Sequence, residues 1–386
     1  MISRRIAAAA VIAIIATQAA CVAAVPRPLL VPATAPTVPS DAANPIAADV
    51  NGDGRDDLLV SAGERLLIFI SRGDGTFAPA SASPIALPMA AHESLAADFN
   101  GDGHADLALA HHDSYDVAIL LGDGAGGFAA PAGSPFSSKP TGKNPHTHGL
   151  AAGDFNRDGR LDLVVGNQND NDLSILLGDG AGKFALALRS PFPCGRSPYP
   201  IATADFDRDG NSDVLVPNAA QRLRTVSFLM GNGNAELAPA PGSPIALAGG
   251  AFFAAAGDLN GDGHPDAVIT HMEGDDRATI LLNDGHGQLA PAPAPASPLT
   301  IGHNAWGVAV GDMNRDGHAD LTFAADDAIR IFVGDARGTF TPAPGSPYLT
   351  PKGAWRLCIA DFNADGKRDV IARCVDAKEL VLFMGQ

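Results

Sequence analysis

The chain has 386 residues and a formal net charge of −17, which argues against nucleic acid or an anionic membrane as a partner because both would repel it. Its 43 glycines and 30 prolines exceed average usage but stay below the level of a disordered low-complexity chain. With 46% hydrophobic residues, this composition favours short strands separated by turns over helical bundles.

Residues 1–24 have the layout of a secretory signal peptide. Two arginines are followed by an uncharged apolar run over residues 6–15 and by small residues before position 25. This run is too short for a membrane span, and no later segment reaches 18 apolar residues. We therefore expect an exported protein, periplasmic or extracellular, with no transmembrane span. Cys21 partly matches a lipoprotein site, so a lipid anchor is the alternative to free release.

Three cysteines remain beyond the signal, and none has the Cys-x-x-Cys spacing of a zinc site. Cys358 and Cys374 fall on expected neighbouring strands, whereas Cys194 stands apart. A disulfide between the first two and a pair of buried free thiols both fit the sequence.

One acidic signature recurs seven times along the chain. Successive copies begin 49 to 56 residues apart, which is the length of a four-stranded propeller blade. In the second repeat a small and apolar strand (95–97) precedes the acidic loop, a second strand (107–110) follows it, and a polar turn leads to a third strand (119–121). The fourth strand is short and rich in proline, which suits an outer edge.

The last repeat stops after its third strand, at Gln386. Residues 28–36 read like the fourth strands of the other repeats. We therefore expect an all-β fold over residues 25–386, a seven-bladed β-propeller of four-stranded antiparallel blades whose ring is closed by the N-terminal segment.

The acidic loops carry oxygen ligands at regular positions. Positions 1, 3, 5 and 9 hold Asp or Asn, position 6 is always Gly, and position 7 offers its backbone carbonyl. Ca²⁺ takes six to eight such oxygens in flexible geometry, and Gly permits the sharp turn, whereas Mg²⁺ demands a stricter octahedron. We expect up to seven Ca²⁺ ions, one per blade, at these residues: Asp49, Asn51, Asp53, Arg55, Asp57; Asp98, Asn100, Asp102, His104, Asp106; Asp154, Asn156, Asp158, Arg160, Asp162; Asp205, Asp207, Asp209, Asn211, Asp213; Asp258, Asn260, Asp262, His264, Asp266; Asp312, Asn314, Asp316, His318, Asp320; Asp361, Asn363, Asp365, Lys367, Asp369.

Such loops also occur as plain turns held by local side-chain hydrogen bonds. Here 22 acidic side chains occupy positions 1, 3, 5 and 9, and their crowding without cations would be strongly repulsive. Loss of residues 1–24 removes two arginines and changes the net charge from −17 to −19. Seven Ca²⁺ ions would add 14 charges and leave −5. Position 12 is apolar instead of Glu, so the loops are not EF-hands.

The segment 153–162, Gly-Asp-Phe-Asn-Arg-Asp-Gly-Arg-Leu-Asp, and its counterparts in the other repeats resemble the FG-GAP/VCBS repeat, as do the Phe/Gly and Ala-Pro segments that follow several of them. This is the family of the integrin α-subunit propeller and of many bacterial exported proteins. The resemblance implies calcium sites on one face of the propeller and a ligand on the opposite face.

The residues six positions before six of the loops would form a ring near the mouth of the central channel. Three interpretations stay open: a structural plug, a surface that stacks on sugars while polar neighbours bind hydroxyls, and a transition-metal site at His146, His148 and neighbouring histidines. The ring residues are His92, His148, Tyr199, Phe252, Trp306 and Trp355, with Arg356 beside them.

No nucleophile elbow, zinc-protease motif or phosphate loop appears in the sequence. We therefore expect a monomeric, non-catalytic module that binds a glycan or a protein. The alternative is a lyase-like enzyme acting on polysaccharides, as in some propellers that this chain resembles. His148 or Tyr199 would then remove a proton and Arg356 would stabilise the enolate.

Overall fold

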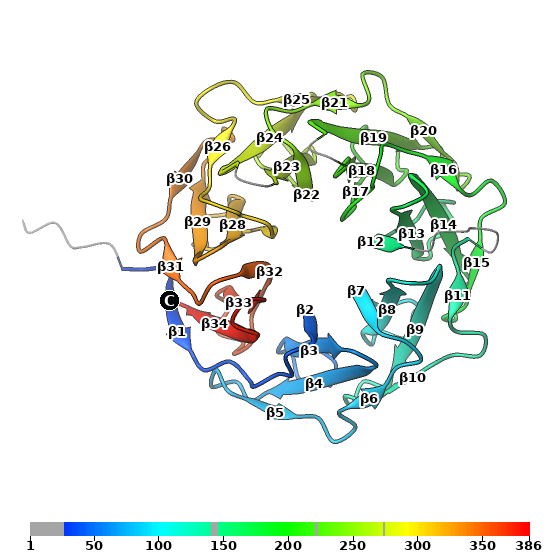
Figure 1. Cartoon of the computed structure of the whole chain (residues 1–386), viewed down its shortest axis with the longest axis vertical. Helices are drawn as coiled ribbons and strands as arrows, with labels where there is room; N and C mark the ends of the chain where they lie inside the picture. Colours follow the sequence, from blue (N-terminus) through cyan, green and yellow to red (C-terminus); the bar gives the residue numbers. More distant parts are fainter. Residues whose placement is uncertain (1–26, 140–145, 221–222, 273–274) are drawn as a thin grey trace, which may run out of the picture.

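The computed structural model describes residues 27–139, 146–220, 223–272 and 275–386, and every element in these ranges is a strand. Seven antiparallel sheets stand around a central axis as the blades of a propeller (Figure 1), so the predicted fold class is confirmed. The expected signal peptide and Cys21 lie outside the described residues. Within those ranges no helix long and apolar enough to cross a membrane is found.

The first two strands of each blade lie nearest the axis and run between the two faces of the propeller. The first strands are β2 (Ala42–Ala48), β7 (Ala91–Ala97), β12 (Thr147–Gly153), β17 (Ala202–Ala204), β22 (Ala251–Gly257), β27 (Val308–Gly311) and β32 (Ala354–Ala360). The second strands are β3 (Asp57–Ala62), β8 (Asp106–His111), β13 (Asp162–Asn167), β18 (Asp213–Pro217), β23 (Asp266–His271), β28 (Asp320–Ala325) and β33 (Asp369–Cys374).

The outer part of each blade contains a long third strand and short edge strands. The third strands are β4 (Arg65–Ser71), β9 (Asp116–Gly122), β14 (Asp172–Gly178), β19 (Thr225–Gly231), β24 (Arg277–Asn283), β29 (Ala328–Gly334) and β34 (Glu379–Gly385). The fourth strands are β5 (Phe77–Pro79), β10 (Phe128–Ala129), β15 (Phe184–Leu186), β20 (Leu237–Pro239), β25 (Leu289–Pro291), β30 (Phe340–Pro342) and, for the last blade, β1 (Leu30–Ala33).

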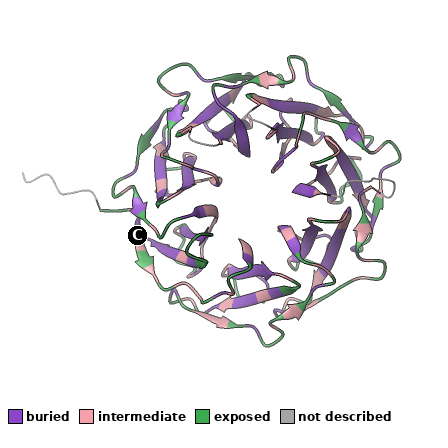
Figure 2. Ribbon diagram, viewed as in Figure 1, coloured by how far each residue is buried: buried purple, intermediate pink, exposed green. Residues whose placement is uncertain are grey.

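The hydrophobic core lies between neighbouring blades. All residues of the second strands are buried (Figure 2), because both faces of these strands pack against side chains of adjacent sheets. One cluster, for example, joins Val164 and Ile175 of the third blade to Val214 and Leu229 of the fourth. The closed circle of blades is therefore needed to complete the core of every blade.

The N-terminal segment closes the ring, as the sequence predicts. Strand β1 pairs antiparallel with β34, with Leu30 opposite Gly385 and Ala33 opposite Leu382. Leu30 is only 1% exposed, and the Tyr348 hydroxyl accepts a hydrogen bond from the N–H of Leu29 at 2.9 Å. The last blade thus takes its outer strand from the other end of the chain.

Six blades carry a further edge strand that the sequence did not predict. Each of these two-residue strands follows a Ser-Pro pair and returns to the third strand of its blade. The serine of the pair supports this return, since Ser134 Oγ accepts a hydrogen bond from the N–H of Ile119 at 2.9 Å. The strands are β6 (Ile85–Ala86), β11 (Phe136–Ser137), β16 (Phe192–Pro193), β21 (Ile245–Ala246), β26 (Leu299–Thr300) and β31 (Tyr348–Leu349).

The three cysteines in the described residues are free thiols. In the pairing of β32 with β33, Ala354 lies opposite Cys374 and Ile371 lies opposite Cys358. The two cysteines are therefore not on paired positions, which favours free thiols over a disulfide; Cys374 is buried and Cys358 is half-buried.

Candidate metal loops and the aromatic ring at the channel mouth

The acidic loops and the expected ring residues lie at opposite ends of the first strands. Strand β7 begins at Ala91, next to His92, and ends at Ala97, just before Asp98. Seven extended residues span roughly 20 Å. The loops therefore occupy one face of the propeller and the ring occupies the other.

Each acidic loop winds the backbone around its own side-chain oxygens. In the second loop, the Asp98 carboxylate accepts hydrogen bonds from the N–H groups of Gly101 (2.7 Å) and Gly103 (2.9 Å). The Asn100 side-chain oxygen accepts from the N–H of Asp102 at 2.9 Å. Gly103, at the invariant position 6, has φ +85°, a backbone conformation that strains other residues. The sequence pattern therefore curls the loop backbone around the side-chain oxygens of positions 1 and 3.

The ninth-position aspartates have a structural role that the sequence did not indicate. Asp106 is fully buried, and its two oxygens accept hydrogen bonds from the N–H groups of Phe99 (2.9 Å) and Gly122 (2.8 Å). The same two contacts recur in all seven blades. Each of these residues thus ties its loop to the third strand, and the remaining lone pairs of the carboxylate stay available to a cation.

Burial dominates the electrostatics of these ninth-position carboxyls. It raises the pKa of Asp162 to about 6 and that of Asp213 to about 7, against the opposing effect of the backbone hydrogen bonds. The nearby carboxylates of the same loop contribute to both increases in pKa. Such a site favours a neutralising partner, either a proton or a cation.

The fourth loop gathers three carboxylates. One oxygen from each of Asp205, Asp207 and Asp213 lies within 4.8 Å of the other two. Asp205 Oδ1 is buried and has no hydrogen-bond partner. Burial, together with the charges of Asp209 and Asp205, raises the pKa of Asp207. This set of hard oxygen donors fits a cation such as Ca²⁺.

Basic side chains link the acidic loops to one another. The Arg157 guanidinium, in the third loop, donates to the backbone carbonyl of Asp209 in the fourth. Arg208 Nη2 donates in turn to the carbonyl of Gly263 in the fifth loop at 2.7 Å. Within the last loop, Lys367 Nζ lies 3.4 Å from Asp365 Oδ2. These cations offset part of the acidic charge and connect neighbouring blades.

The ring of aromatic and histidine side chains expected at the opposite face is present. Its side chains contact one another in sequence from blade two to blade seven, with centroid distances of 4.5 to 4.8 Å between successive rings. Blade one has Ala43 at the corresponding position, so the ring is open there. In order, its members are His92, His148, Tyr199, Phe252, Trp306 and Trp355.

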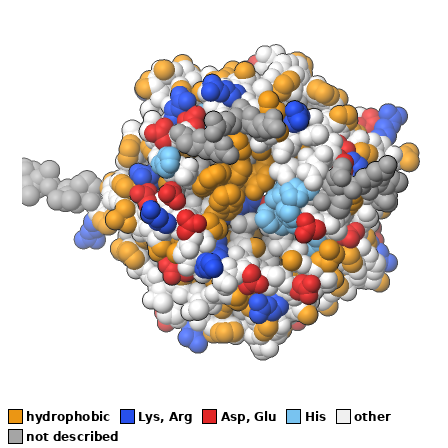
Figure 3. Space-filling model, in the orientation of Figure 1, with side chains coloured by type: hydrophobic (Ala, Val, Ile, Leu, Met, Phe, Trp, Pro, Cys, Tyr) orange, Lys and Arg blue, Asp and Glu red, His pale blue; other side chains and the backbone are white. Residues whose placement is uncertain are grey.

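The ring has a buried part and an accessible part. Tyr199 and Phe252 are 8% and 6% exposed and pack as a core. Trp306 and Trp355 are half-buried and stack on each other. Figure 3 shows an apolar patch at the centre of this face with histidines beside it. The ring therefore both closes the channel and presents an apolar surface at its mouth.

Beneath the ring, Arg356 pairs with Glu93 inside the channel. Arg356 Nη1 lies 2.7 Å from Glu93 Oε2, and the guanidinium carbon lies 4.6 Å from the centroid of Phe253. Both charged residues border a cavity of about 210 Å³. Glu93 was not predicted as a site residue, because a single acidic residue within a strand carries no pattern. Its only sequence signal is its place next to His92.

The ring residues with titratable groups are held in their neutral forms. Burial, together with the charges of the neighbouring histidines and Arg356, lowers the pKa of His148 to about 2. Burial also raises the pKa of the Tyr199 hydroxyl.

The chain is similar over part of its length to larger curated proteins. It is 31% identical to human cartilage acidic protein 1 over 140 residues, which are 34% of this chain and 21% of that protein. It is 30% identical to integrin alpha pat-2 of Caenorhabditis elegans over 148 residues, 32% of this chain and 12% of that protein. The matched region thus spans about a fifth or less of the length of these relatives.

Solved structures share the fold. A lectin of Agrocybe aegerita, described as recognising non-reducing terminal N-acetylglucosamine, superposes with a TM-score of 0.56 at 19% identity, over 79% of this chain and 81% of the lectin chain. At this identity the likeness shows the fold alone.

The model of the FG-GAP-like repeat matches five overlapping segments, residues 49–109, 98–165, 154–216, 258–323 and 314–372. Together these segments cover well over half of the sequence and contain all seven acidic loops. The chain therefore belongs to the FG-GAP-like repeat family.

Proposed function

We propose that this protein is an exported calcium-binding propeller that binds a glycan or a protein ligand, without catalysis, through the face that carries the aromatic ring. The observation that carries the binding role is the stacked, half-buried pair Trp306 and Trp355 at the channel mouth. Flat aromatic faces in contact with water suit the apolar faces of sugar rings or an apolar anchor of a protein partner. Export rests on the pattern of residues 1–24.

The calcium role is supported by the loops on the opposite face. The buried Asp205 oxygen without a hydrogen donor and the three converging carboxylates of its loop are matched by a hard divalent cation. The other six loops have the same backbone curl, in which the N–H of position 6 donates to the carboxylate of position 1, with Asn in place of Asp207 at position 3. We propose that Ca²⁺ bound in the loops holds the blades in register while the ring face contacts the ligand.

A glycan is the first ligand class to examine. The lectin of Agrocybe aegerita shares this fold and is described as recognising terminal N-acetylglucosamine. The ring face also offers polar groups beside its aromatic rings, including His92 and His112.

The lyase alternative receives less support from the geometry. His148 and Tyr199 are 5% and 8% exposed, so neither presents a free base to a polymer. The Arg356 guanidinium is already paired with Glu93. These three groups pack within the channel, which leaves them little access to a polysaccharide chain.

The tryptophan pair provides the test. In the presence of Ca²⁺, retention of Trp306→Ala and Trp355→Ala on glycan and protein arrays should fall by about tenfold or more relative to the wild type, as for removal of a central aromatic anchor. Leu188→Ala is a matched control, because Leu188 is 98% exposed in the outer turn between β15 and β16. Undiminished retention by both tryptophan variants would place the ligand site elsewhere. Unsaturated products from a uronic-acid polysaccharide would favour the lyase.

A further inference from the structure

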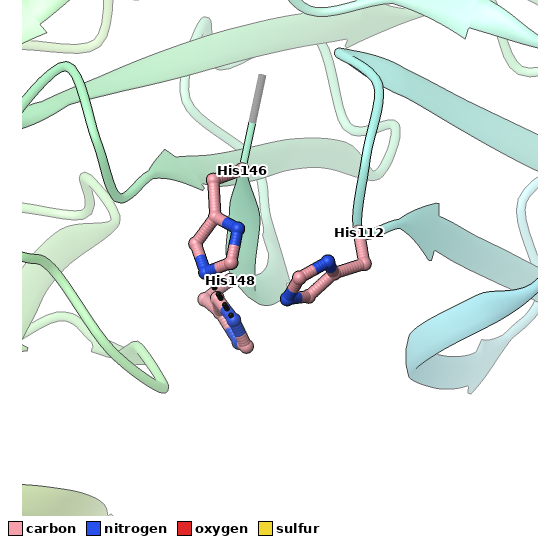
Figure 4. Close-up of side chains that lie close together, drawn as sticks. All are labelled: His112, His146 and His148. Carbon is pink, nitrogen blue, oxygen red and sulfur yellow. Dashed lines mark hydrogen bonds between the residues drawn. The ribbon is translucent and has the colours of Figure 1, made fainter. Parts of the chain in front are cut away.

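Three histidines meet at the edge of the ring, between blades two and three. His112 follows strand β8 in the turn to β9, whereas His146 and His148 lie at the entry to β12. One ring nitrogen from each of the three lies within 4.8 Å of the other two. Figure 4 shows the three imidazoles facing one another. His112 and His146 are half-buried, and His148 is 5% exposed.

The spacing of these nitrogens fits a metal ion. Nε2 of His146 and Nε2 of His148 are 3.2 Å apart. In a tetrahedral zinc site with Zn–N bonds of 2.0–2.1 Å, the ligand nitrogens lie about 3.4 Å from one another. The third nitrogen lies within 4.8 Å, so a small rotation of one ring completes a three-nitrogen set.

The hydrogen bonding of the cluster is incomplete without an ion. The Nε2 atoms of His146 and His148 form a hydrogen bond only if one carries a proton and the other does not. His148 Nδ1 is buried and has no hydrogen-bond partner. Whichever tautomer His148 adopts, a polar atom stays unmatched, and this is costly in a buried site.

A carboxylate is hydrogen-bonded to one of the three rings, and a second carboxylate lies near another. His112 Nδ1 lies 2.7 Å from Asp113 Oδ1, which fixes the proton on Nδ1 and leaves Nε2 with a free lone pair. His148 Nδ1 lies 4.0 Å from Glu93 Oε1, which is beyond hydrogen-bond distance, and Glu93 is itself paired with Arg356. A carboxylate on the outer nitrogen is the usual support of a histidine that ligates a metal.

Packing alone does not explain the three imidazoles. Blades four to seven fill the ring with Tyr199, Phe252, Trp306 and Trp355, which close the channel without imidazole nitrogens. Blades two and three instead place histidines there, and His112 and His146 add two more rings in contact, with centroids 3.9 Å apart.

The geometry points to a site at His112, His146 and His148 for one divalent transition ion that prefers imidazole, such as Zn²⁺, with a fourth coordination position open at the channel mouth. Three histidines and an open position form a recognised ligand set for such ions. The acidic loops differ in kind, since they offer only hard oxygen donors. Zinc binding at the histidine site can therefore be tested separately from calcium binding in the loops.

The whole chain, stripped with chelator and returned to saturating Ca²⁺, is titrated with Zn²⁺, and the zinc retained after gel filtration is measured. The wild type should retain one Zn²⁺ per chain, and Co²⁺ in its place should give the visible absorption of a tetrahedral nitrogen site. His112→Ala/His146→Ala should lose both signals. His303→Ala should keep them, since His303 is an exposed histidine outside the cluster. Asp113→Asn should weaken Zn²⁺ binding about 10- to 100-fold through the orientation of His112.

Absence of retained Zn²⁺ in the wild type overturns the proposal, as does equal retention by the wild type and the double variant. Saturating Ca²⁺ prevents the acidic loops from supplying the signal. If the double variant does not fold, the Co²⁺ spectrum of the wild type and the Zn²⁺ affinity of Asp113→Asn test the site instead. The Asp113 side chain is 84% exposed, so its replacement leaves the core intact.

Discussion

At the scale of single residues, the end of the second strand holds a polar side chain in several blades. In blade three Asn167 is fully buried, and its Nδ2 donates to Ser174 Oγ at 3.0 Å. In blade five His271 takes this place, with Nε2 2.8 Å from Thr279 Oγ1 and Nδ1 3.1 Å from Asp275 Oδ2. Both side chains form hydrogen bonds with a hydroxyl of the third strand of their blade. Of the two residue types, only histidine titrates near neutral pH.

We predict that His271 makes the stability of the fold depend on pH. Burial lowers its pKa below the ordinary 6.5, although Asp275 opposes the shift. Below pH 6.5 the unfolded chain takes up a proton that the folded chain refuses, so this stability is present above pH 6.5 and is lost as the pH falls. His271→Asn, which introduces the side chain that blade three has at Asn167, should reduce the loss of unfolding free energy between pH 7.5 and 5.5, as measured by urea titration. Identical pH profiles for the variant and the wild type would contradict this role.

At the scale of elements, β1 is the strand on which ring closure depends. It supplies the outer edge of the last blade, and Leu30 packs into a core cluster with Ile331, Val370 and Phe383. Without β1, the edge of β34 would expose unpaired backbone groups. The first and last blades are therefore held together by a strand far from its partner in sequence.

We predict that Leu30→Ala lowers the free energy of unfolding by about 2–5 kcal/mol, because it leaves a cavity at a buried position. Pro32→Ala is the matched control, since Pro32 lies on the same strand but is exposed and should change stability little. Chemical denaturation of the two variants measures the difference. Equal midpoints for both would mean that β1 does not hold the ring closed.

How far the sequence predicts these elements depends on the pattern that each one leaves. The pairing of β1 with the last blade can be predicted because the last repeat lacks a fourth strand. The aromatic ring at the channel mouth can be predicted because its members stand at a fixed offset before the acidic loops. Strand β6 and its five counterparts were missed, because two residues carry no periodicity and the serine that supports them resembles an ordinary turn residue. Glu93 and His112 were missed as site residues because their partners, Arg356 and His146, lie on other blades and only the closed ring brings them together.

At the scale of the whole molecule, the two faces of the propeller differ in chemistry. One face holds seven acidic loops with 22 acidic side chains at the expected ligand positions, and arginines such as Arg157 and Arg208 connect adjacent loops. The other face holds the aromatic and imidazole ring. We expect charge neutralisation on the first face to stabilise the closed propeller, which in turn positions the aromatic residues on the second face.

Calcium content and thermal unfolding, measured together on the purified chain with and without the chelator EGTA, test this account most directly. We predict up to seven bound Ca²⁺ ions and a large drop in the unfolding temperature on chelation. Each site occupied at 100 times its Kd stabilises the folded state by about 2.7 kcal/mol, and the effects of separate sites accumulate. A protein that binds no Ca²⁺, and whose unfolding curve is the same in EGTA, would contradict the account.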